Sequence, residues 1–225
     1  MNGNLIECIS VCKHYAINNK AITALSDVSL QIRNNEMVLL KGRSGAGKST
    51  LLYLMSGLIN PTHGRVIIDG SCLSDLSEKA ISNLLLNRFG FIFQNFNLLP
   101  TYTVYENIEI ALVQKKMSRN TMRKSIMMLL EKFNIHNKSE LFPSGLSIGQ
   151  QQLVAIIRTL VKKPSVVFAD EPTGSVDDET AGEIIEHLLD LKKEQEMTIV
   201  MATHGNISEK LADRTIILEN GRIKE

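Results

Sequence analysis

A glycine-rich segment between an apolar run and a helix-prone stretch constrains this fold more than any other feature. Residues 42–50 read GRSGAGKST, which matches the pattern GxxxxGK[ST]. Residues 37–40 (MVLL) predict a strand before the segment, and residues 49–56 predict a helix after it. In that context glycines let backbone N–H groups hold phosphate oxygens, aided by the positive end of the helix. An ordinary glycine turn is the weaker interpretation, so we predict a phosphate-binding loop formed by Gly42, Arg43, Ser44, Gly45, Ala46, Gly47, Lys48, Ser49 and Thr50.

Two residues of this loop and a later acidic pair predict the chemistry. Lys48 is expected to reach the β- and γ-phosphates of a nucleotide, and the Ser49 hydroxyl is expected to bind Mg²⁺. Asp170 and Glu171 end the apolar run at residues 166–169. Ligands in parallel α/β sheets bind beyond the carboxyl ends of strands, so both carboxylates should face the loop. Adjacent acidic residues are usually a solvated surface, but this pair ends an apolar strand. We therefore expect Asp170 beside the metal and Glu171 polarising an attacking water.

Strand and helix patterns alternate in the second half of the chain. Residues 166–169 and 198–202 are apolar runs typical of strands buried on both faces of a parallel sheet. Between them, residues 181–191 place apolar side chains on one helix face, and Asp177 or Asp178 stands at the helix start. Strand, helix and strand in this order predict a parallel crossover unit.

The remaining regions follow other patterns. Residues 25–32 and 65–68 alternate like half-buried antiparallel strands. Residues 94–163 are mostly helical by pattern and include a methionine-rich stripe, for which core packing is a better interpretation than a ligand-binding face. No repeat or flexible linker interrupts the chain, so its 225 residues are expected to form one domain.

The composition excludes several classes of protein. Lys plus Arg (25) nearly balances Asp plus Glu (24). The net charge of +1 therefore indicates no strong electrostatic attraction to nucleic acid or to an anionic membrane. The N-terminal stretch lacks the apolar block of a signal peptide, and no uncharged run could span a bilayer as a plain helix. Cys8, Cys12 and Cys72 lack metal-site spacing, so small buried thiols are a better interpretation than a disulfide or a zinc site.

A short segment in the helical region carries a resemblance to a known family. Residues 146–150 (LSIGQ), followed by QQLVA, resemble the LSGGQ signature of the ATP-binding cassette (ABC) family. The resemblance implies that Ser147, Gly149 and Gln150 contact the ATP held by a second copy of the chain. In the family this segment begins a helix, whose free N–H groups suit a phosphate.

Four further positions resemble the same family in the same order. Gln94, after the residues GFIF, matches the glutamine loop that contacts Mg²⁺ and water and senses the membrane partner. His204 matches the switch histidine that contacts the γ-phosphate, and residues 175–177 resemble the loop that crosses the dimer interface. Tyr15 matches the aromatic residue that stacks on adenine, although a tyrosine there could simply pack on the sheet.

The resemblance implies an α/β fold with a P-loop NTPase (ABC ATPase) core, an N-terminal antiparallel β subdomain and an inserted α-helical subdomain. Residues 1–93 and 164–225 would form the core with the β subdomain, and residues 94–163 the helical subdomain. ATP and Mg²⁺ are the implied cofactors. The implied partners are a second copy in a head-to-tail dimer and a separately encoded integral membrane permease, at the cytoplasmic face of the membrane and without nucleic acid.

Within the family, residues 89–100 and 105–107 look like the group that serves lipoprotein release, macrolide export and bacitracin-type peptide resistance, together with the related cell-division ATPase. The expected function is ATP hydrolysis that drives export or extraction of a lipoprotein, peptide or drug. A nucleotide-gated regulatory or mechanotransmitting module with little turnover is the alternative. A soluble ABC ATPase of translation or DNA repair is disfavoured, since those proteins generally carry two cassettes or long coiled-coil insertions.

Two residues depart from the family pattern. Ile148 stands where the family usually has glycine, and Leu153 stands where it usually has arginine. Isoleucine has restricted rotamers and excludes a positive φ. If Ile148 faces the nucleotide or the opposing loop, closure of the dimer weakens; if it points away, little changes.

Overall fold

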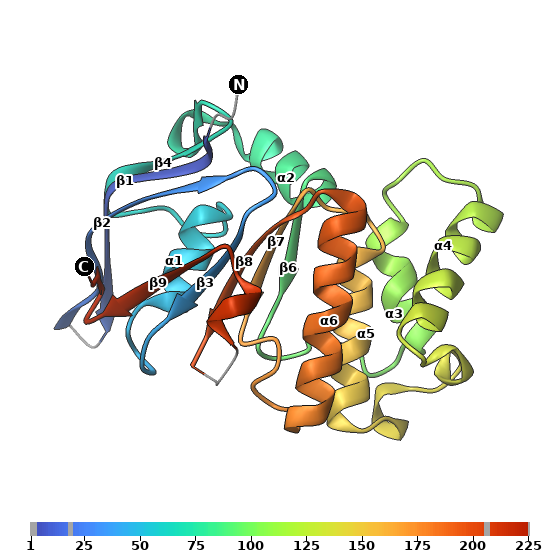
Figure 1. The fold of residues 1–225 in the computed structure, drawn as a ribbon. Helices are drawn as coiled ribbons and strands as arrows, with labels where there is room; N and C mark the ends of the chain where they lie inside the picture. The colour runs from blue at the N-terminus through green and yellow to red at the C-terminus, as the bar shows by residue number, and fades with distance from the viewer. Residues whose placement is uncertain (1–3, 18–19, 205–207, 225) are drawn as a thin grey trace.

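The structure, a computed structural model, describes residues 4–17, 20–204 and 208–224 and is built on two sheets of different type (Figure 1). In these ranges a six-stranded sheet has the order β10–β9–β3–β8–β7–β6, and all its neighbouring strands are parallel except β9 and β10. Its strands are β3 (Met37–Lys41), β6 (Phe89–Ile92), β7 (Val166–Asp170), β8 (Thr198–Thr203), β9 (Arg214–Glu219) and β10 (Arg222–Ile223). The parallel strands predicted before the phosphate loop and at residues 166–169 and 198–202 are confirmed.

A four-stranded antiparallel sheet lies beside it, in the order β2–β1–β4–β5. Its strands are β1 (Asn4–Ile17), β2 (Lys20–Arg33), β4 (His63–Ile68) and β5 (Ser71–Cys72). The two predicted antiparallel strands are confirmed as parts of β2 and β4. Strand β1 was not predicted, because its register shifts between Cys8 and Val11 and Ser10 has a φ of 47°. Such a bulge breaks the two-residue alternation that identifies a strand in a sequence.

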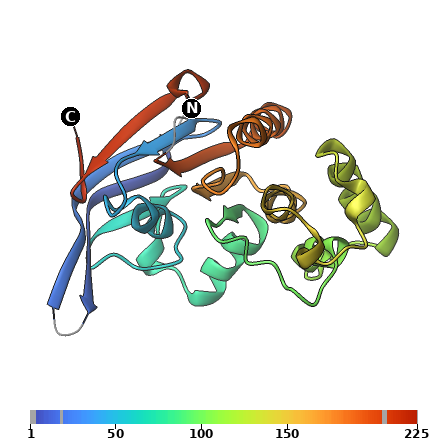
Figure 2. The same ribbon diagram turned by 90° about the horizontal axis from the view of Figure 1, so that it is seen from below.

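Helices cover the central sheet, and α3 to α6 gather on the side away from the antiparallel sheet (Figures 1 and 2). Helix α1 contacts strands of both sheets. The helices are α1 (Lys48–Met55), α2 (Glu78–Asn87), α3 (Val104–Glu109), α4 (Arg119–Lys132), α5 (Ile148–Leu160) and α6 (Asp178–Gln195). Residues 94–163, all of them described, contain helices and no strand, as the sequence predicted.

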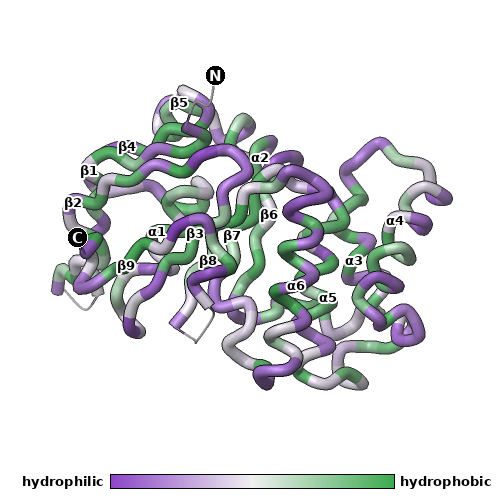
Figure 3. Tube along the Cα trace, viewed as in Figure 1, coloured by the Kyte–Doolittle hydropathy of each residue, from purple (hydrophilic) through white to green (hydrophobic). Residues whose placement is uncertain are grey.

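Alternate residues of the central strands face two separate cores. On β3, Met37 and Leu39 belong to a cluster with the helices, whereas Val38 and Leu40 belong to a cluster with α1 and the antiparallel sheet. Strands β7 and β8 divide in the same way, and all their residues are buried. Figure 3 shows the hydrophobic colour running along these strands. The sheet is therefore buried on both faces, which explains its unbroken apolar runs.

The predicted helix faces are confirmed as core. The methionine-rich stripe of α4 packs inside the helical cluster, with Met122, Ile126, Leu129 and Leu130 buried. Helix α6 buries Ile184, Ile185, Leu188 and Leu191. In the part of the chain that the structure describes, no helix combines the length and the apolar character needed to cross a membrane.

The three cysteines are free thiols, as the sequence predicted, but only one of them is buried. Cys8 belongs to β1 of the antiparallel sheet and is buried in the core, where burial raises the pKa of its thiol to about 12. Cys12 and Cys72 are half-buried, so the expectation of burial was wrong for these two.

Candidate nucleotide site

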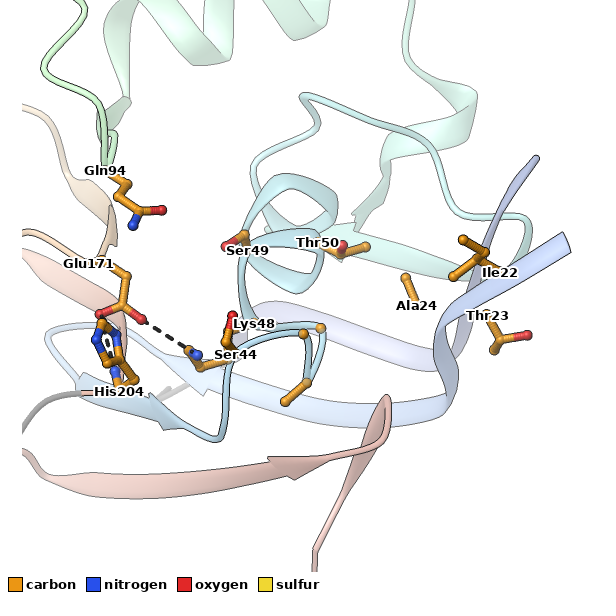
Figure 4. A pocket seen from close by; sticks show the side chains of 13 residues that line it. Ile22, Thr23, Ala24, Ser44, Lys48, Ser49, Thr50, Gln94, Glu171 and His204 are labelled. Carbon is orange, nitrogen blue, oxygen red and sulfur yellow. Dashed lines mark hydrogen bonds and ion pairs between the residues drawn. The ribbon is translucent and has the colours of Figure 1, made fainter. Parts of the chain in front are cut away.

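The predicted phosphate loop wraps a cavity of about 420 Å³ beyond the carboxyl end of β3 (Figure 4). Residues 44–50 line it, together with Gln94, Glu171 and His204 from the neighbouring strand ends. Gly42 and Arg43 line a second hollow beside β9 instead. The structure therefore brings most of the predicted loop, catalytic and metal-side residues to one place.

Gly47 shapes the loop at the point where α1 begins. It has a φ of 102° and occupies the N-cap position of the helix. A Cβ atom there would lie 2.6 Å from the backbone oxygen of Ala24 and 2.7 Å from Cδ2 of Leu25. Only glycine meets both requirements, the positive φ and the close approach of β2. The turn places Lys48 at the first position of α1, where it is only 7% exposed.

The Lys48 ammonium folds back over the loop. Its Nζ donates to the backbone oxygens of Gly42 at 2.9 Å and Arg43 at 3.3 Å. It also lies 3.5 Å from Oε1 of Glu171, which is 8% exposed. A buried cation with these partners lines the cavity, where it suits an anionic phosphate.

Asp170 ends β7 behind the loop and is 2% exposed. Its Oδ1 accepts a hydrogen bond from Ser49 Oγ at 2.9 Å, and its Oδ2 accepts one from the Tyr53 hydroxyl at 3.3 Å. Burial raises the pKa of Asp170, and the two hydroxyl hydrogen bonds counteract part of that rise. Burial and the charge of Asp170 raise the pKa of Tyr53 in turn. Hydroxyl and carboxylate oxygens are the hard ligands that Mg²⁺ prefers, so this donor set fits the ion.

Glu171 lies between Lys48 and His204, as the dashed lines of Figure 4 show. Its Oε2 is 2.8 Å from Nδ1 of His204 and accepts the backbone N–H of that residue at 3.1 Å. The His204 side chain is 57% exposed, so of the two residues it lies on the solvent side. Glu171 has a φ of 50°, a left-handed conformation that L-residues other than Asn and Asp rarely adopt. A carboxylate held at this point could accept a proton from a water in the cavity.

Gln94 and Tyr15 differ in their relation to the cavity. Gln94 follows β6, and its side chain extends toward the cavity in Figure 4. Tyr15 is not among the lining residues; it pairs with Ile22 across β1 and β2, and Lys13 Nζ lies 5.4 Å from its ring centre. Ile22 itself lines the cavity. The adenine-stacking role of Tyr15 stays a prediction.

The signature segment lies at the start of α5 and does not line the cavity of its own chain. Ser147 is the N-cap: its Oγ accepts the N–H of Gln150 at 3.2 Å, and Oε1 of Gln150 accepts the N–H of Ser147 at 3.1 Å. This capping box fixes the entry of the helix. A Cβ on Gly149 would lie 3.2 Å from Cγ2 of Thr180, so the segment packs closely on α6.

The two departures from the family pattern fit the fold. Ile148 is the first residue of α5, has a negative φ and is 56% exposed. Isoleucine therefore introduces no backbone strain at this position, and its side chain points outward from the chain. Leu153 is 8% exposed and packs in the helical core, which suits an apolar residue better than a cation.

Sequence reasoning missed several residues of the site. Residues 22–24 of β2 line the cavity opposite Gln94 and Glu171, and no motif marks them. Tyr53 contacts Asp170 from α1, four residues after Ser49. Since residues four apart share one face of a helix, this spacing is the signal that could have identified Tyr53.

Comparisons with known proteins agree with this geometry. The family model described as "ABC transporter" matches residues 25–174. The ABC transporter ATP-binding protein YtrE of Bacillus subtilis is 40% identical over 203 residues, which cover 90% of this chain and 88% of YtrE. The lipoprotein-releasing system ATP-binding protein LolD of Blochmanniella floridana is 35% identical and covers 96% of this chain and 92% of LolD. The methionine import ATP-binding protein MetN of Coxiella burnetii is 39% identical over 98% of this chain, which spans 63% of MetN.

Solved structures match over nearly the whole chain. The dimeric structure of MJ0796, a bacterial ABC transporter cassette from Methanocaldococcus jannaschii, aligns with a TM-score of 0.92 at 35% identity and covers 98% of this chain and 97% of that one. A second MJ0796 dimer, in a post-hydrolysis state bound to ADP and Pi, aligns with a TM-score of 0.91. The phosphate loop, the signature helix and these relatives agree that this chain belongs to the ABC transporter family, as an ATP-binding subunit with ATPase activity.

Proposed function

We propose that two copies of this chain pair head to tail around two ATP molecules and drive a separately encoded membrane permease from the cytoplasmic face of the membrane. One observation carries the proposal: the start of α5, with Ser147, Gly149 and Gln150, lies outside the cavity that the same chain forms. Each chain thus holds a phosphate-binding half and a separate helix start that suits a phosphate. The dimeric structures of MJ0796 support this pairing.

The cavity residues take distinct roles in this proposal. Lys48 holds the β- and γ-phosphates, and Ser49, Asp170 and Gln94 hold Mg²⁺, whose charge neutralises the phosphates when it is bound. Glu171 accepts a proton from the attacking water. His204, 2.8 Å from Glu171, orients that carboxylate and reaches the γ-phosphate.

The nucleobase end of the site rests on Tyr15 and the exposed side chain of Ile22. Ile22 is 48% exposed at the cavity wall, so it offers apolar surface to a base. A base stacked on an aromatic ring gains about 1–3 kcal/mol. Tyr15 on the adjoining strand would provide that ring. Replacing it with alanine should weaken ATP binding and leave the sequence of chemical steps at the phosphates unchanged.

We assign the cargo to the lipoprotein, peptide or drug class handled by exporters and extraction systems. Residues 89–100 and 105–107 support this assignment, as does the likeness to LolD. A neighbouring reading frame that encodes a permease with four membrane helices and a large external domain would support it. A neighbouring permease of the methionine-import type would overturn it.

The dimer is tested with Glu171→Gln, which keeps the size of the side chain and removes its basicity. We expect the variant to form a stable dimer with ATP and Mg²⁺ in size-exclusion chromatography, because closure proceeds and hydrolysis does not. Glu131→Gln on the exposed face of α4 is the matched control and should behave like the wild type. A Glu171→Gln variant that stays monomeric under saturating ATP and retains wild-type turnover would contradict the proposal.

One observation favours a second role within the family, a nucleotide-gated regulatory module with low turnover. Ile148 exposes a branched apolar side chain on the helix start that would meet the second copy. Comparing ATP hydrolysis by the wild type and by Ile148→Gly separates the two roles. Turnover that is absent in the wild type and present in Ile148→Gly favours the module, whereas similar turnover in both favours the transporter ATPase.

A further inference from the structure

Asp170 is held by two hydroxyl groups from a single face of α1. Ser49 donates to Oδ1 at 2.9 Å and Tyr53 donates to Oδ2 at 3.3 Å. Each oxygen of the carboxylate therefore has one donor, and the carboxylate is 2% exposed. Rotation of the carboxylate about its χ2 angle would break both hydrogen bonds, so its plane is set before any metal ion arrives.

The ring of Tyr53 contacts a different part of the molecule. Its centre lies 5.4 Å from the ring centre of Phe91 on β6, and Phe91 lies 4.3 Å from Phe93. Both phenylalanines line a groove of about 670 Å³ that is distinct from the nucleotide cavity and also lined by Arg158 and Lys162. Gln94 follows Phe93 directly and lines the nucleotide cavity. Tyr53 thus contacts Asp170 with its hydroxyl and the wall of the groove with its ring.

We propose that Tyr53 is a positioning residue, which orients Asp170 for Mg²⁺ and couples that orientation to the Phe91–Phe93 wall of the groove. This inference rests on the proposed function, because it takes Asp170 as the metal-side carboxylate. The physical basis is the fixed geometry of a hydrogen-bonded ligand: a carboxylate that is already oriented loses less freedom when the ion binds. A change in the packing of Phe91 shifts the Tyr53 ring and, with it, the hydroxyl that holds Oδ2.

The hydroxyl is tested with Tyr53→Phe, which keeps the ring and removes the donor. ADP, which is not hydrolysed, is titrated calorimetrically in excess Mg²⁺ and again in EDTA. We expect affinity in Mg²⁺ to fall about three- to tenfold, as for loss of a hydrogen bond of ordinary net strength, with affinity in EDTA unchanged. A purely structural role would lower both affinities by the same factor and would overturn the inference. Tyr102→Phe, at a tyrosine that is 42% exposed and distant from α1 in sequence, is the matched control.

The coupling to the groove is tested with Phe91→Leu, alone and combined with Tyr53→Phe. Loss of the aromatic contact should lower affinity in Mg²⁺ about two- to fivefold and leave affinity in EDTA unchanged. Because both substitutions act through one hydrogen bond, the double variant should be no weaker than Tyr53→Phe. Losses that multiply would overturn the coupling. Phe91→Met serves as a second variant, and urea unfolding verifies that each variant is folded.

Asp170→Asn separates this inference from the proposed function. If Asp170→Asn leaves the ratio of the Mg²⁺ and EDTA affinities unchanged, the metal-side role proposed for Asp170 is wrong, and the inference about Tyr53 fails with it. If Asp170→Asn lowers the ratio and Tyr53→Phe does not, the inference about Tyr53 fails alone. A lower ratio in both variants supports both the metal-side role of Asp170 and the positioning role of Tyr53.

Discussion

Replacing Gly47 with alanine should destabilise the protein through two separable effects. The φ of 102° disfavours any L-residue, which costs about 1–2 kcal/mol. The added methyl group would also lie 2.6 Å from the backbone oxygen of Ala24 and 2.7 Å from Leu25. Ala24 belongs to β2, whose backbone is held in the antiparallel sheet, so the contact forces a shift that costs about 1–3 kcal/mol more. We expect a total loss of about 2–5 kcal/mol in the free energy of unfolding.

Gly45 provides the matched control for the contact. Its φ of 79° disfavours alanine as well, but a Cβ there would meet no atom within 4 Å. Gly45→Ala should therefore lose only the conformational part, about 1–2 kcal/mol. Urea unfolding without nucleotide measures the free energy of unfolding of both variants, and one common m-value is used for the two fits. If the two variants are equally stable to within about 0.5 kcal/mol, the close approach of β2 does not limit the loop and the reasoning is refuted.

Two pH-dependent predictions follow from other groups. Hydrogen bonds from the Thr180 backbone and hydroxyl lower the pKa of Asp177, the N-cap of α6. The contribution of the Asp177 carboxylate to the free energy of unfolding is thus present above about pH 4, and it is lost as pH falls through the lower folded-state pKa. The difference in the free energy of unfolding between the wild type and Asp177→Ala should therefore narrow in acid. Burial, and then the charge of Lys115, lowers the pKa of Lys162 to about 8. The unfolded chain binds more protons between that pKa and about 10.4, so stability should rise with pH there. In urea unfolding, the free energy of unfolding of Lys162→Met should rise less steeply with pH than that of the wild type. Equal slopes in the two proteins would contradict a lowered pKa of Lys162.

The phosphate loop and the parallel strands were predictable because their patterns are local. The apolar runs before Gly42 and before Asp170 become β3 and β7, since a strand buried on both faces requires an unbroken apolar sequence. Asp177 was identified as one of two candidates for the start of α6, and its hydrogen bond to the N–H of Thr180 decides between them. Element boundaries were less predictable: α1 begins one residue and β4 two residues before the predicted start, whereas β2 begins five residues before it.

The parts that were missed depend on contacts between distant segments. Helix α2 was missed although Ser77 caps its start and Ile81, Leu84 and Leu85 lie at helical spacing. That apolar face is only half-buried against the core, and none of the residues of α2 is fully buried. Strand β1 is hidden by its bulge at Ser10. The contact between Tyr53 and Asp170 joins residues 117 apart in the chain. The four-residue spacing from Ser49 places Tyr53 on the same face of α1, but the contact with Asp170 itself depends on how α1 packs against β7.

The left-handed backbone of Glu171 has an evolutionary consequence. A φ of 50° at a glutamate raises the energy of the folded state by about 1–2 kcal/mol relative to glycine, a sizeable share of the ~5–15 kcal/mol that holds a domain together. Selection for stability alone would replace this glutamate with glycine or asparagine. Under the proposed role of Glu171 as the base, descendants of this chain that no longer need to hydrolyse ATP are expected to drift toward those residues at position 171, while active descendants keep a less stable fold.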